Sequence, residues 1–174
     1  IYGVLSGTIY GATWTTDARF GNYALSFDGN DYISVNNDPS LNSVNAISIE
    51  AWVKPTANSG ADQEIVRKMC GSSGGYALRL NSSGNGVQAF IRNASGNLLY
   101  ASSPTINLNF SQWAHVAMTY NSSGYLKTYV NGVLDQQLAA IGSLGTDSGN
   151  LGVGGYPSLC PNSSWVEFFN GIID

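Results

Sequence analysis

The segment from Trp113 to Gln137, which reads WAHVAMTYNSSGYLKTYVNGVLDQQ, constrains the fold of this chain more than any other. Two apolar-rich runs, Trp113–Tyr120 and Leu126–Val130, flank a turn-forming Asn-Ser-Ser-Gly. Asn131-Gly132 then joins the second run to a third, Val133–Gln137. Asn-Gly between strand-like runs is the strongest short hairpin signal, because a type I′ turn needs positive φ at both central residues. The segment therefore predicts three consecutive antiparallel strands.

Short runs of the same kind recur along the chain, separated by clusters of small polar residues. Gly (21), Ser (22) and Asn (18) make up 61 of the 174 residues and are spread over many such clusters. Regular short strands without long helical patterns predict an all-β, antiparallel two-sheet β-sandwich. The other predicted strands are Ala24–Asp28, Tyr32–Val35, Ile47–Val53, Glu64–Lys68, Tyr76–Leu80, Val87–Arg92, Leu98–Tyr100, Leu151–Val153 and Phe168–Ile173.

Two local patterns refine this expectation. In Ala46–Val53 every second residue is apolar, which predicts that Ile47, Ile49, Ala51 and Val53 face the interior. Pro39-Ser40-Leu41 follows Asp38, a suitable capping residue, and predicts one helical turn.

Length and charge narrow the class of protein. The 174 residues fit one domain, 1–174, with a sizeable core. The net charge is −4, and no cluster of Lys or Arg occurs, which argues against nucleic acid as a partner. No apolar run approaches the ~20 residues of a spanning helix, so no membrane insertion is expected.

The cysteines and the glycosylation sequons favour an exported protein. Cys70 and Cys160 both lie in loops rich in Gly, Ser or Pro, which favours a disulfide over two unrelated free thiols. Asn-X-Ser/Thr sequons, the acceptor sites for N-glycosylation, occur at Asn81, Asn93, Asn109, Asn121 and Asn162.

Several segments in series resemble the laminin-G-like, or concanavalin A-like, jelly-roll family. ALSFDGNDYISV at 24–35 is similar to the family's ALxFDGxxDYVxV element, and ISIEAWVKP at 47–55 is similar to its S-x-E-x-W-V-K-P strand. WAHVA at 113–117, YVNG at 129–132 and FNGIID at 169–174 are similar to further elements in the family's order. The resemblance implies a jelly-roll β-sandwich used outside the cell or at its surface.

The resemblance also implies a metal. In many jelly rolls of this type, calcium joins the first and last strands through an Asp in the position of Asp174. Asp28 is a second candidate ligand, with turn capping as its alternative role. Calcium is accordingly the expected cofactor.

The ends of the chain depart from the family pattern. The family usually continues after Asp174 with another strand, and Ile1–Tyr10 does not match its usual first strand. The domain is therefore expected to lack terminal strands, which a neighbouring copy of the chain could supply by strand addition.

Catalysis is not expected. Laminarinase-type enzymes with this fold carry three acids on one strand, whereas Asp62-Gln63-Glu64 supplies only two, interpreted as a solvated loop entering a strand. The lone His115 is interpreted as a structural residue packed beside Trp113, with a ligand contact as the alternative.

Three aromatic residues are the predicted ligand-binding set. Tyr156 and Trp165 belong to the long loop that contains Cys160, and a Cys70–Cys160 bridge would bring Tyr76 beside them. Exposed rings with polar neighbours suit sugars, and the alternative role of these rings is to cover the edge of the sandwich. The resemblance implies a glycan as the first expected partner and an extracellular protein as the second. The alternatives are a subunit of a surface filament or layer and, less favoured, a glycan-active enzyme.

Overall fold

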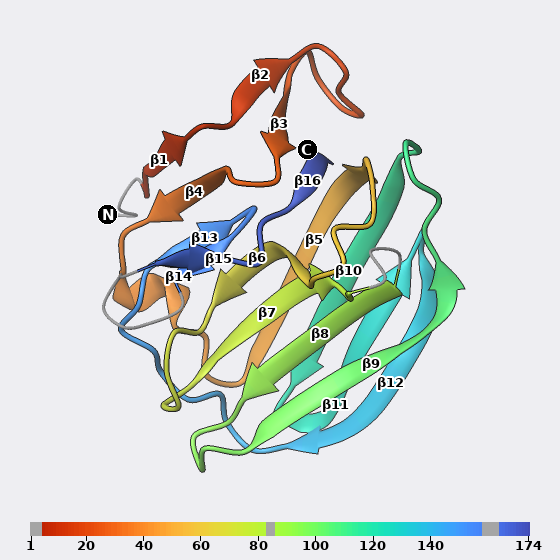
Figure 1. Ribbon diagram of the computed structural model, residues 1–174. Helices are drawn as coiled ribbons and strands as arrows, with labels where there is room; N and C mark the ends of the chain where they lie inside the picture. Colours follow the sequence, from red (N-terminus) through yellow and green to blue (C-terminus); the bar gives the residue numbers. More distant parts are fainter. Residues whose placement is uncertain (1–4, 83–85, 158–163) are drawn as a thin grey trace.

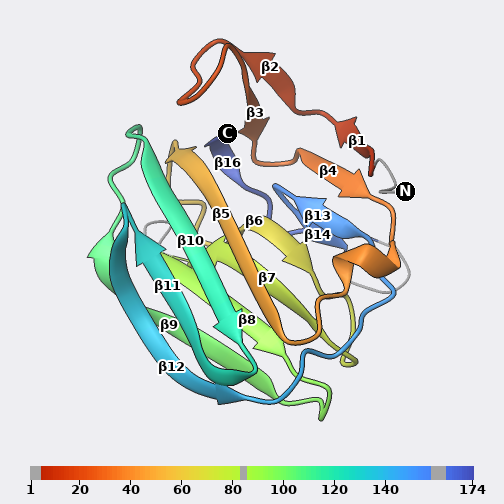
Figure 2. The same cartoon turned by 180° about the vertical axis from the view of Figure 1, so that it is seen from behind.

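The computed structural model describes residues 5–82, 86–157 and 164–174. In these residues two seven-stranded antiparallel sheets pack face to face, with β7, β8 and β9 in front in Figure 1 and β5, β10 and β11 in front in Figure 2. The expected two-sheet β-sandwich is confirmed. A short two-stranded ribbon, β14 (Tyr156–Pro157) with β15 (Trp165–Val166), accompanies the two large sheets.

The first sheet carries the candidate site on its outer face. Its strands, in spatial order, are β1 (Gly7–Tyr10), β4 (Tyr32–Val35), β13 (Leu151–Val153), β6 (Gln63–Lys68), β7 (Gly75–Leu80), β8 (Gly86–Arg92) and β9 (Leu98–Asn107). Because β4, β13 and β6 are distant in sequence, the sheet brings three separate parts of the chain side by side.

The second sheet contains the predicted hairpins. Its strands, in spatial order, are β12 (Val133–Ile141), β11 (Ser123–Val130), β10 (Ala114–Asn121), β5 (Ala46–Pro55), β16 (Asn170–Ile173), β3 (Ala24–Asp28) and β2 (Thr13–Thr15). The Asn131-Gly132 turn is confirmed, since both residues have positive φ (50° and 79°) and Val130 pairs with Val133.

The core lies between the sheets and follows strand alternation. In β5 the buried or half-buried positions Ile47, Ile49, Ala51 and Val53 face inward, as predicted. Phe27 and Phe169 meet edge to face at 6.3 Å between ring centres, deep in this core. The predicted helical turn is the 3₁₀ helix η1 (Pro39–Leu41), where the Asp38 side chain accepts the Ser40 N–H.

The C-terminal strand is paired on both sides. β16 is hydrogen-bonded to β3 on one side and to β5 on the other, so it inserts between two strands from the first third of the chain. The expected completion of the domain by strands of a neighbouring copy stays a prediction. At the other end, β1 and β2 are the outermost described strands of their sheets.

His115 packs against a different tryptophan than expected. The His115 ring lies on the outer face of the second sheet, 5.3 Å from the ring centre of Trp52 on the neighbouring strand, rather than against Trp113. Trp113 is half-buried just before β10, and its indole N–H donates to Asp17 Oδ1 at 3.2 Å.

Candidate functional site

Two of the three predicted ligand-binding aromatic residues, Tyr156 and Trp165, lie close together, whereas the third, Tyr76, is buried elsewhere. Tyr156 and Trp165 lie on the paired strands β14 and β15 and are both half-buried. Tyr76 is only 5% exposed, and its hydroxyl donates to the Leu41 carbonyl at 3.0 Å. Burial raises the pKa of Tyr76 to about 12. The prediction for Tyr76 was wrong, because its position on β7 faces the core.

Trp165 instead joins two rings that were not predicted for the site. Its ring stacks on Tyr32 with 3.8 Å between ring centres and an interplanar angle of 14°. On its other side Tyr32 stacks on Tyr10, at 4.6 Å and 19°. A Cβ atom at Gly152 would lie 2.1 Å from the Gly155 carbonyl oxygen and 2.8 Å from the indole ring of Trp165. A glycine at this position of β13 therefore permits the close approach of both the Gly155 backbone and the indole.

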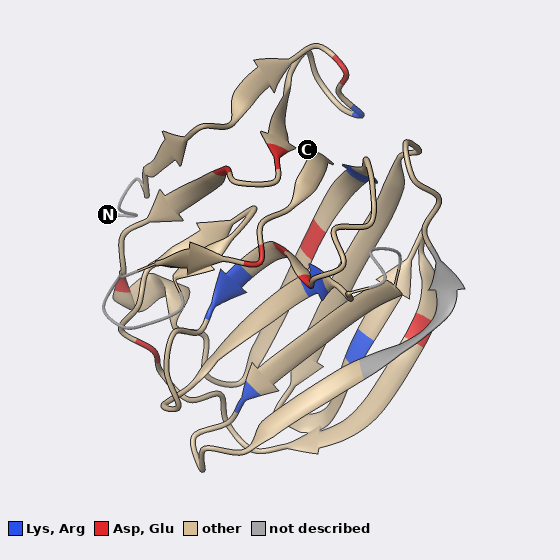
Figure 3. Ribbon diagram, in the orientation of Figure 1, with Lys and Arg blue, Asp and Glu red and all other residues tan. Residues whose placement is uncertain are grey.

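The stack borders a hollow of about 300 Å³ on the outer face of the first sheet. We call it the aromatic hollow, and its lining residues are Thr8, Tyr10, Tyr32, Ser34, Asn36, Asn150 and Trp165. The Asn150 side chain is held in place, since its Nδ2 donates to Ser34 Oγ at 3.0 Å and its Oδ1 accepts the Asn37 N–H at 3.1 Å. No Lys or Arg lies on β1, β4 or β13, the strands beneath it (Figure 3).

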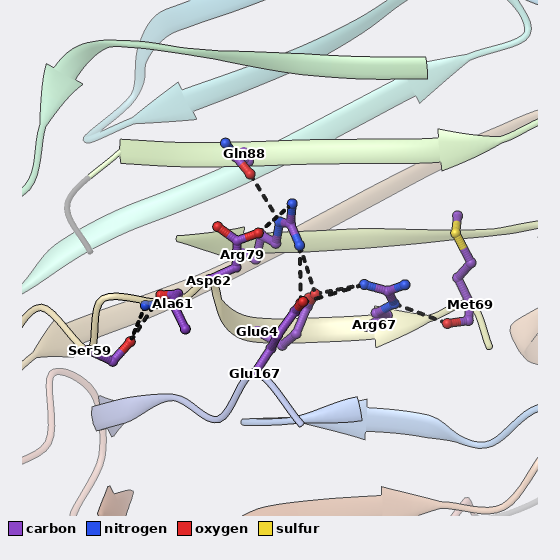
Figure 4. A network of polar contacts seen from close by, with 9 residues as sticks. All are labelled: Ser59, Ala61, Asp62, Glu64, Arg67, Met69, Arg79, Gln88 and Glu167. Carbon is purple, nitrogen blue, oxygen red and sulfur yellow. Dashed lines mark hydrogen bonds and ion pairs between the residues drawn. The ribbon is translucent and has the colours of Figure 1, made fainter. Parts of the chain in front are cut away.

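A network of charged side chains joins β6, β7 and the segment that follows β15 (Figure 4). Glu64 Oε1 accepts from Arg67 at 2.9 Å and lies 3.6 Å from Arg79 Nη1. Arg79 also contacts Glu167 at 3.1 Å and Asp62 at 2.7 Å. The network ties β6 and β7 to the segment that carries Trp165, because Glu167 lies two residues after that ring.

Two features of the network mark it as unusual. Glu64 is fully buried, and its Oε2 has no hydrogen-bond partner. Burial is the main cause that raises the pKa of Glu64 to about 8, against the opposing effect of Arg67 and Arg79.

Glu167 has φ of 53°, which is uncommon for a residue other than glycine. Its carbonyl accepts the Glu64 N–H at 2.8 Å, so backbone and side chain both hold this conformation.

The acids at 62–64 do not form an accessible catalytic pair. Glu64 was expected to be solvated where a loop enters the strand Glu64–Lys68, but the structure buries it beneath Arg67 and Arg79. Asp62 is paired with Arg79, so both carboxylates already have cationic partners. Gln63 faces away from them, and its amide oxygen accepts the Asn170 N–H at 2.9 Å.

The candidate calcium ligands do not converge. Asp28 pairs with Asn170, so Asp174 lies four residues further along the neighbouring strand, about 13 Å away. Asp174 Oδ2 accepts the backbone N–H groups of Arg19 and Phe20 at 2.6 and 2.7 Å, and Asp28 Oδ1 accepts the Asn30 N–H. Within residues 5–82, 86–157 and 164–174, no three His, Cys, Asp or Glu side chains are grouped to hold a metal ion. The two acids therefore do not share one ion, and calcium binding at Asp174 or at Asp28 with carbonyl ligands stays a prediction.

The predicted modifications have different outcomes. Asn93 is only 6% exposed, and its Oδ1 accepts two backbone N–H groups, so the glycosylation prediction at this sequon was wrong. Asn109 and Asn121 are exposed and Asn81 is half-buried; their glycosylation stays a prediction. Asn162 and Cys160 lie outside the described residues, so the Cys70–Cys160 disulfide also stays a prediction.

Comparison with known proteins establishes the family. The chain belongs to the concanavalin A-like lectin/glucanases superfamily, whose laminin-G-type model matches residues 27–174. A comparison with curated proteins gives no match. No helix in the described part of the chain is long and apolar enough to cross a membrane.

Solved structures share the fold at low sequence identity. Domain 4 of AbnA, an extracellular GH43 arabinanase from Geobacillus stearothermophilus in complex with arabinotriose, has a TM-score of 0.73 and 20% identity over 97% of this chain and 79% of its own. The receptor-binding domain of botulinum neurotoxin mosaic serotype C/D has a TM-score of 0.66 and 18% identity over 98% of this chain. The serotype D ligand-binding domain, in complex with N-acetylneuraminic acid, has a TM-score of 0.64 and 17% identity over 95% of this chain. This chain spans 42% of each neurotoxin domain.

Sequence reasoning missed most of the hollow. Tyr32 and Ser34 alternate with the apolar Ile33 and Val35, and this alternation predicts that Tyr32 and Ser34 lie on the outer face of the sheet. No sequence signal placed Tyr10 or Asn150 beside them, because those contacts depend on the order of strands in the sheet.

Proposed function

We propose that the protein is a non-catalytic glycan-binding module and that its ligand occupies the aromatic hollow. The observation that carries this proposal is the combination of stacked rings with hydroxyl and amide groups in one hollow. A sugar presents apolar C–H faces and polar edges, so it needs both kinds of partner. Membership in a lectin and glucanase superfamily supports the same interpretation.

The hollow is well organised for binding. Tyr32 lies between Tyr10 and Trp165, and Asn150 is held by Ser34 and by the backbone of Asn37. Side chains that are ordered before binding lose little conformational entropy when the ligand arrives. The neighbouring ionic network supports the backbone that follows Trp165, which adds to this preorganisation.

A binding role is favoured over a catalytic one. The acids nearest the hollow in the described first sheet, including Glu64, are buried or paired with arginines rather than placed around an open substrate position. The resemblance in fold to a domain solved with arabinotriose and to one solved with N-acetylneuraminic acid supports a glycan as the ligand class. An extracellular or cell-surface location is part of the proposal, supported by the extracellular arabinanase among the similar structures.

The proposal is tested by glycan-array binding followed by titration calorimetry on the strongest hit. Trp165→Ala and Tyr10→Ala should each weaken binding by about tenfold or more, because a ring that contacts a sugar contributes more than about 1.4 kcal/mol. Trp14→Ala is the matched control, since Trp14 is 67% exposed on β2 of the second sheet. The Trp14→Ala variant should bind the glycan with the same affinity as the unmodified protein.

Two outcomes would contradict the proposal. One is the absence of binding to any glycan on the array. The other is glycan binding that Trp14→Ala removes while folded Trp165→Ala and Tyr10→Ala retain it, which would move the ligand to the second sheet.

A further inference from the structure

The charge of the hollow restricts the sugars that it can accept. Its lining side chains carry the hydroxyls of Thr8, Ser34 and the two tyrosines, the amides of Asn36 and Asn150 and the indole N–H of Trp165, all uncharged. A carboxylated sugar needs a cation or several directed donors to replace the water that its carboxylate loses on binding. The position of every cation in the chain therefore bears on which sugars can bind.

Four of the seven Lys and Arg residues lie on the first sheet, and each of them makes polar contacts within the protein, although the buried Nε of Arg92 has no hydrogen-bond partner. Arg67 lies on β6, next to β13, but it contacts Glu64 and the Met69 carbonyl and lies 3.6 Å from the ring centre of Tyr156. Arg79 contacts three carboxylates. Arg92 Nη1 donates to the Gly96 carbonyl at 2.8 Å.

Lys68 is the fourth of these cations and is fully buried. Its Nζ donates to Asn37 Oδ1 at 2.8 Å, to the Asp147 carbonyl at 2.8 Å and to the Gly149 carbonyl at 2.9 Å. All three donors of the ammonium group are therefore used inside the protein.

The remaining three cations lie with the second sheet. Lys54 contacts Asp17 at 2.6 Å, and Arg19 lies over the ring of Trp52 at 4.5 Å. Lys127 is on β11, near the ring of Tyr125. In Figure 3 the Lys and Arg segments are correspondingly absent from β1, β4 and β13.

From these placements we infer that the aromatic hollow selects neutral sugars and discriminates against sugars that carry a carboxylate, such as uronic acids and N-acetylneuraminic acid. The inference rests on the proposed glycan-binding function. A carboxylate in the hollow would lose hydration without gaining a cation, in a protein whose net charge is −4. The hydroxyl groups of a neutral sugar can hydrogen-bond to both donors and acceptors among the amides and hydroxyls that line the hollow.

The test is a set of matched trisaccharides measured by titration calorimetry and ligand-observed NMR. Neutral trisaccharides of glucose, galactose and mannose are each paired with the corresponding uronic-acid trisaccharide, and arabinotriose and N-acetylneuraminic acid are added. The uronic acid replaces a hydroxymethyl group by a carboxylate and leaves the ring unchanged. We expect binding to at least one neutral member, with its acidic partner weaker by about tenfold or more.

A charge-insertion variant tests the cause of the selectivity. Thr8 is exposed on the edge strand β1 and lines the hollow, so Thr8→Lys adds a cation there. This variant should strengthen binding of the acidic partner by about tenfold and have less effect on the neutral one. Thr13→Lys is the matched control, because Thr13 is an exposed strand threonine of the second sheet. It should leave the preference unchanged.

The outcomes separate the two proposals. If acidic members bind as tightly as neutral ones, and Trp165→Ala abolishes both, the selectivity inference is overturned while glycan binding at the hollow stands. If Thr8→Lys leaves the preference as it was, the electrostatic cause is overturned. If no member of the neutral or acidic sets binds and the glycan array is also blank, the proposed function itself fails.

Discussion

Replacing Glu64 by glutamine should change how the stability of the protein depends on pH. Burial raises the pKa of Glu64 from its ordinary 4.5 to about 8. Below pH 4.5 the carboxyl is protonated in the folded and unfolded states alike. Between pH 4.5 and 8 the unfolded chain has lost this proton while the folded protein keeps it, so stability falls as pH rises. Above about pH 8 both states are ionised and this dependence ends.

The size of the effect follows from the width of that window. The difference of 3.5 pKa units between 4.5 and 8 corresponds to roughly 5 kcal/mol at most, at about 1.4 kcal/mol per unit. This is comparable to the whole ~5–15 kcal/mol of a typical domain. The glutamine side chain would have the shape of the protonated acid and no proton to lose. The Glu64→Gln variant should therefore be more stable than the unmodified protein at pH 9 and about equal to it at pH 4.5.

The assay is urea unfolding, followed by tryptophan fluorescence, at one-unit steps from pH 4.5 to pH 9. Asp62→Asn is the matched control, because Asp62 contacts the same Arg79 from a more exposed position. It should keep the pH dependence of the unmodified protein. The reasoning is refuted if Glu64→Gln shows the same fall in stability with pH as the unmodified protein, or if it is strongly destabilised at pH 9.

Three further changes test other parts of the structure. Tyr76→Phe should lower the free energy of unfolding by about 1 kcal/mol, because the hydrogen bond to the Leu41 carbonyl is lost. It should leave glycan affinity unchanged, and a loss of affinity would show that Tyr76 belongs to the binding site. Lys68→Met should cost about 3 kcal/mol or more in urea unfolding, because two buried carbonyl oxygens and the side-chain oxygen of Asn37 lose their donor, and an unchanged midpoint would contradict this. Calcium binding at Asp174 predicts a higher melting temperature in excess calcium than in excess chelator, and identical melting temperatures would contradict calcium binding.

Strand positions and strand faces were largely determined by local sequence. The boundaries of Ala24–Asp28, Tyr32–Val35 and Leu151–Val153 were predicted as they are found, and the Asn131-Gly132 hairpin was predicted with its turn type. These features depend on the period of two along a strand and on the φ preferences of Asn and Gly, which act over a few residues. The strands β1 and β2 were missed, because both are short and exposed and carry little apolar pattern.

The candidate site was decided by tertiary structure. Tyr10, Tyr32 and Trp165 come from the two ends of the chain, and only the pairing of β1 with β4 and β4 with β13 stacks their rings. The same applies to Glu64, which local sequence placed where a solvated loop enters a strand. Its burial arises because Arg67, Arg79 and the segment around Glu167 close over it, and this burial raises its pKa although the two arginines oppose the shift. Local sequence determines which way a side chain faces along its strand, whereas the order of strands in the sheet determines which side chains it meets.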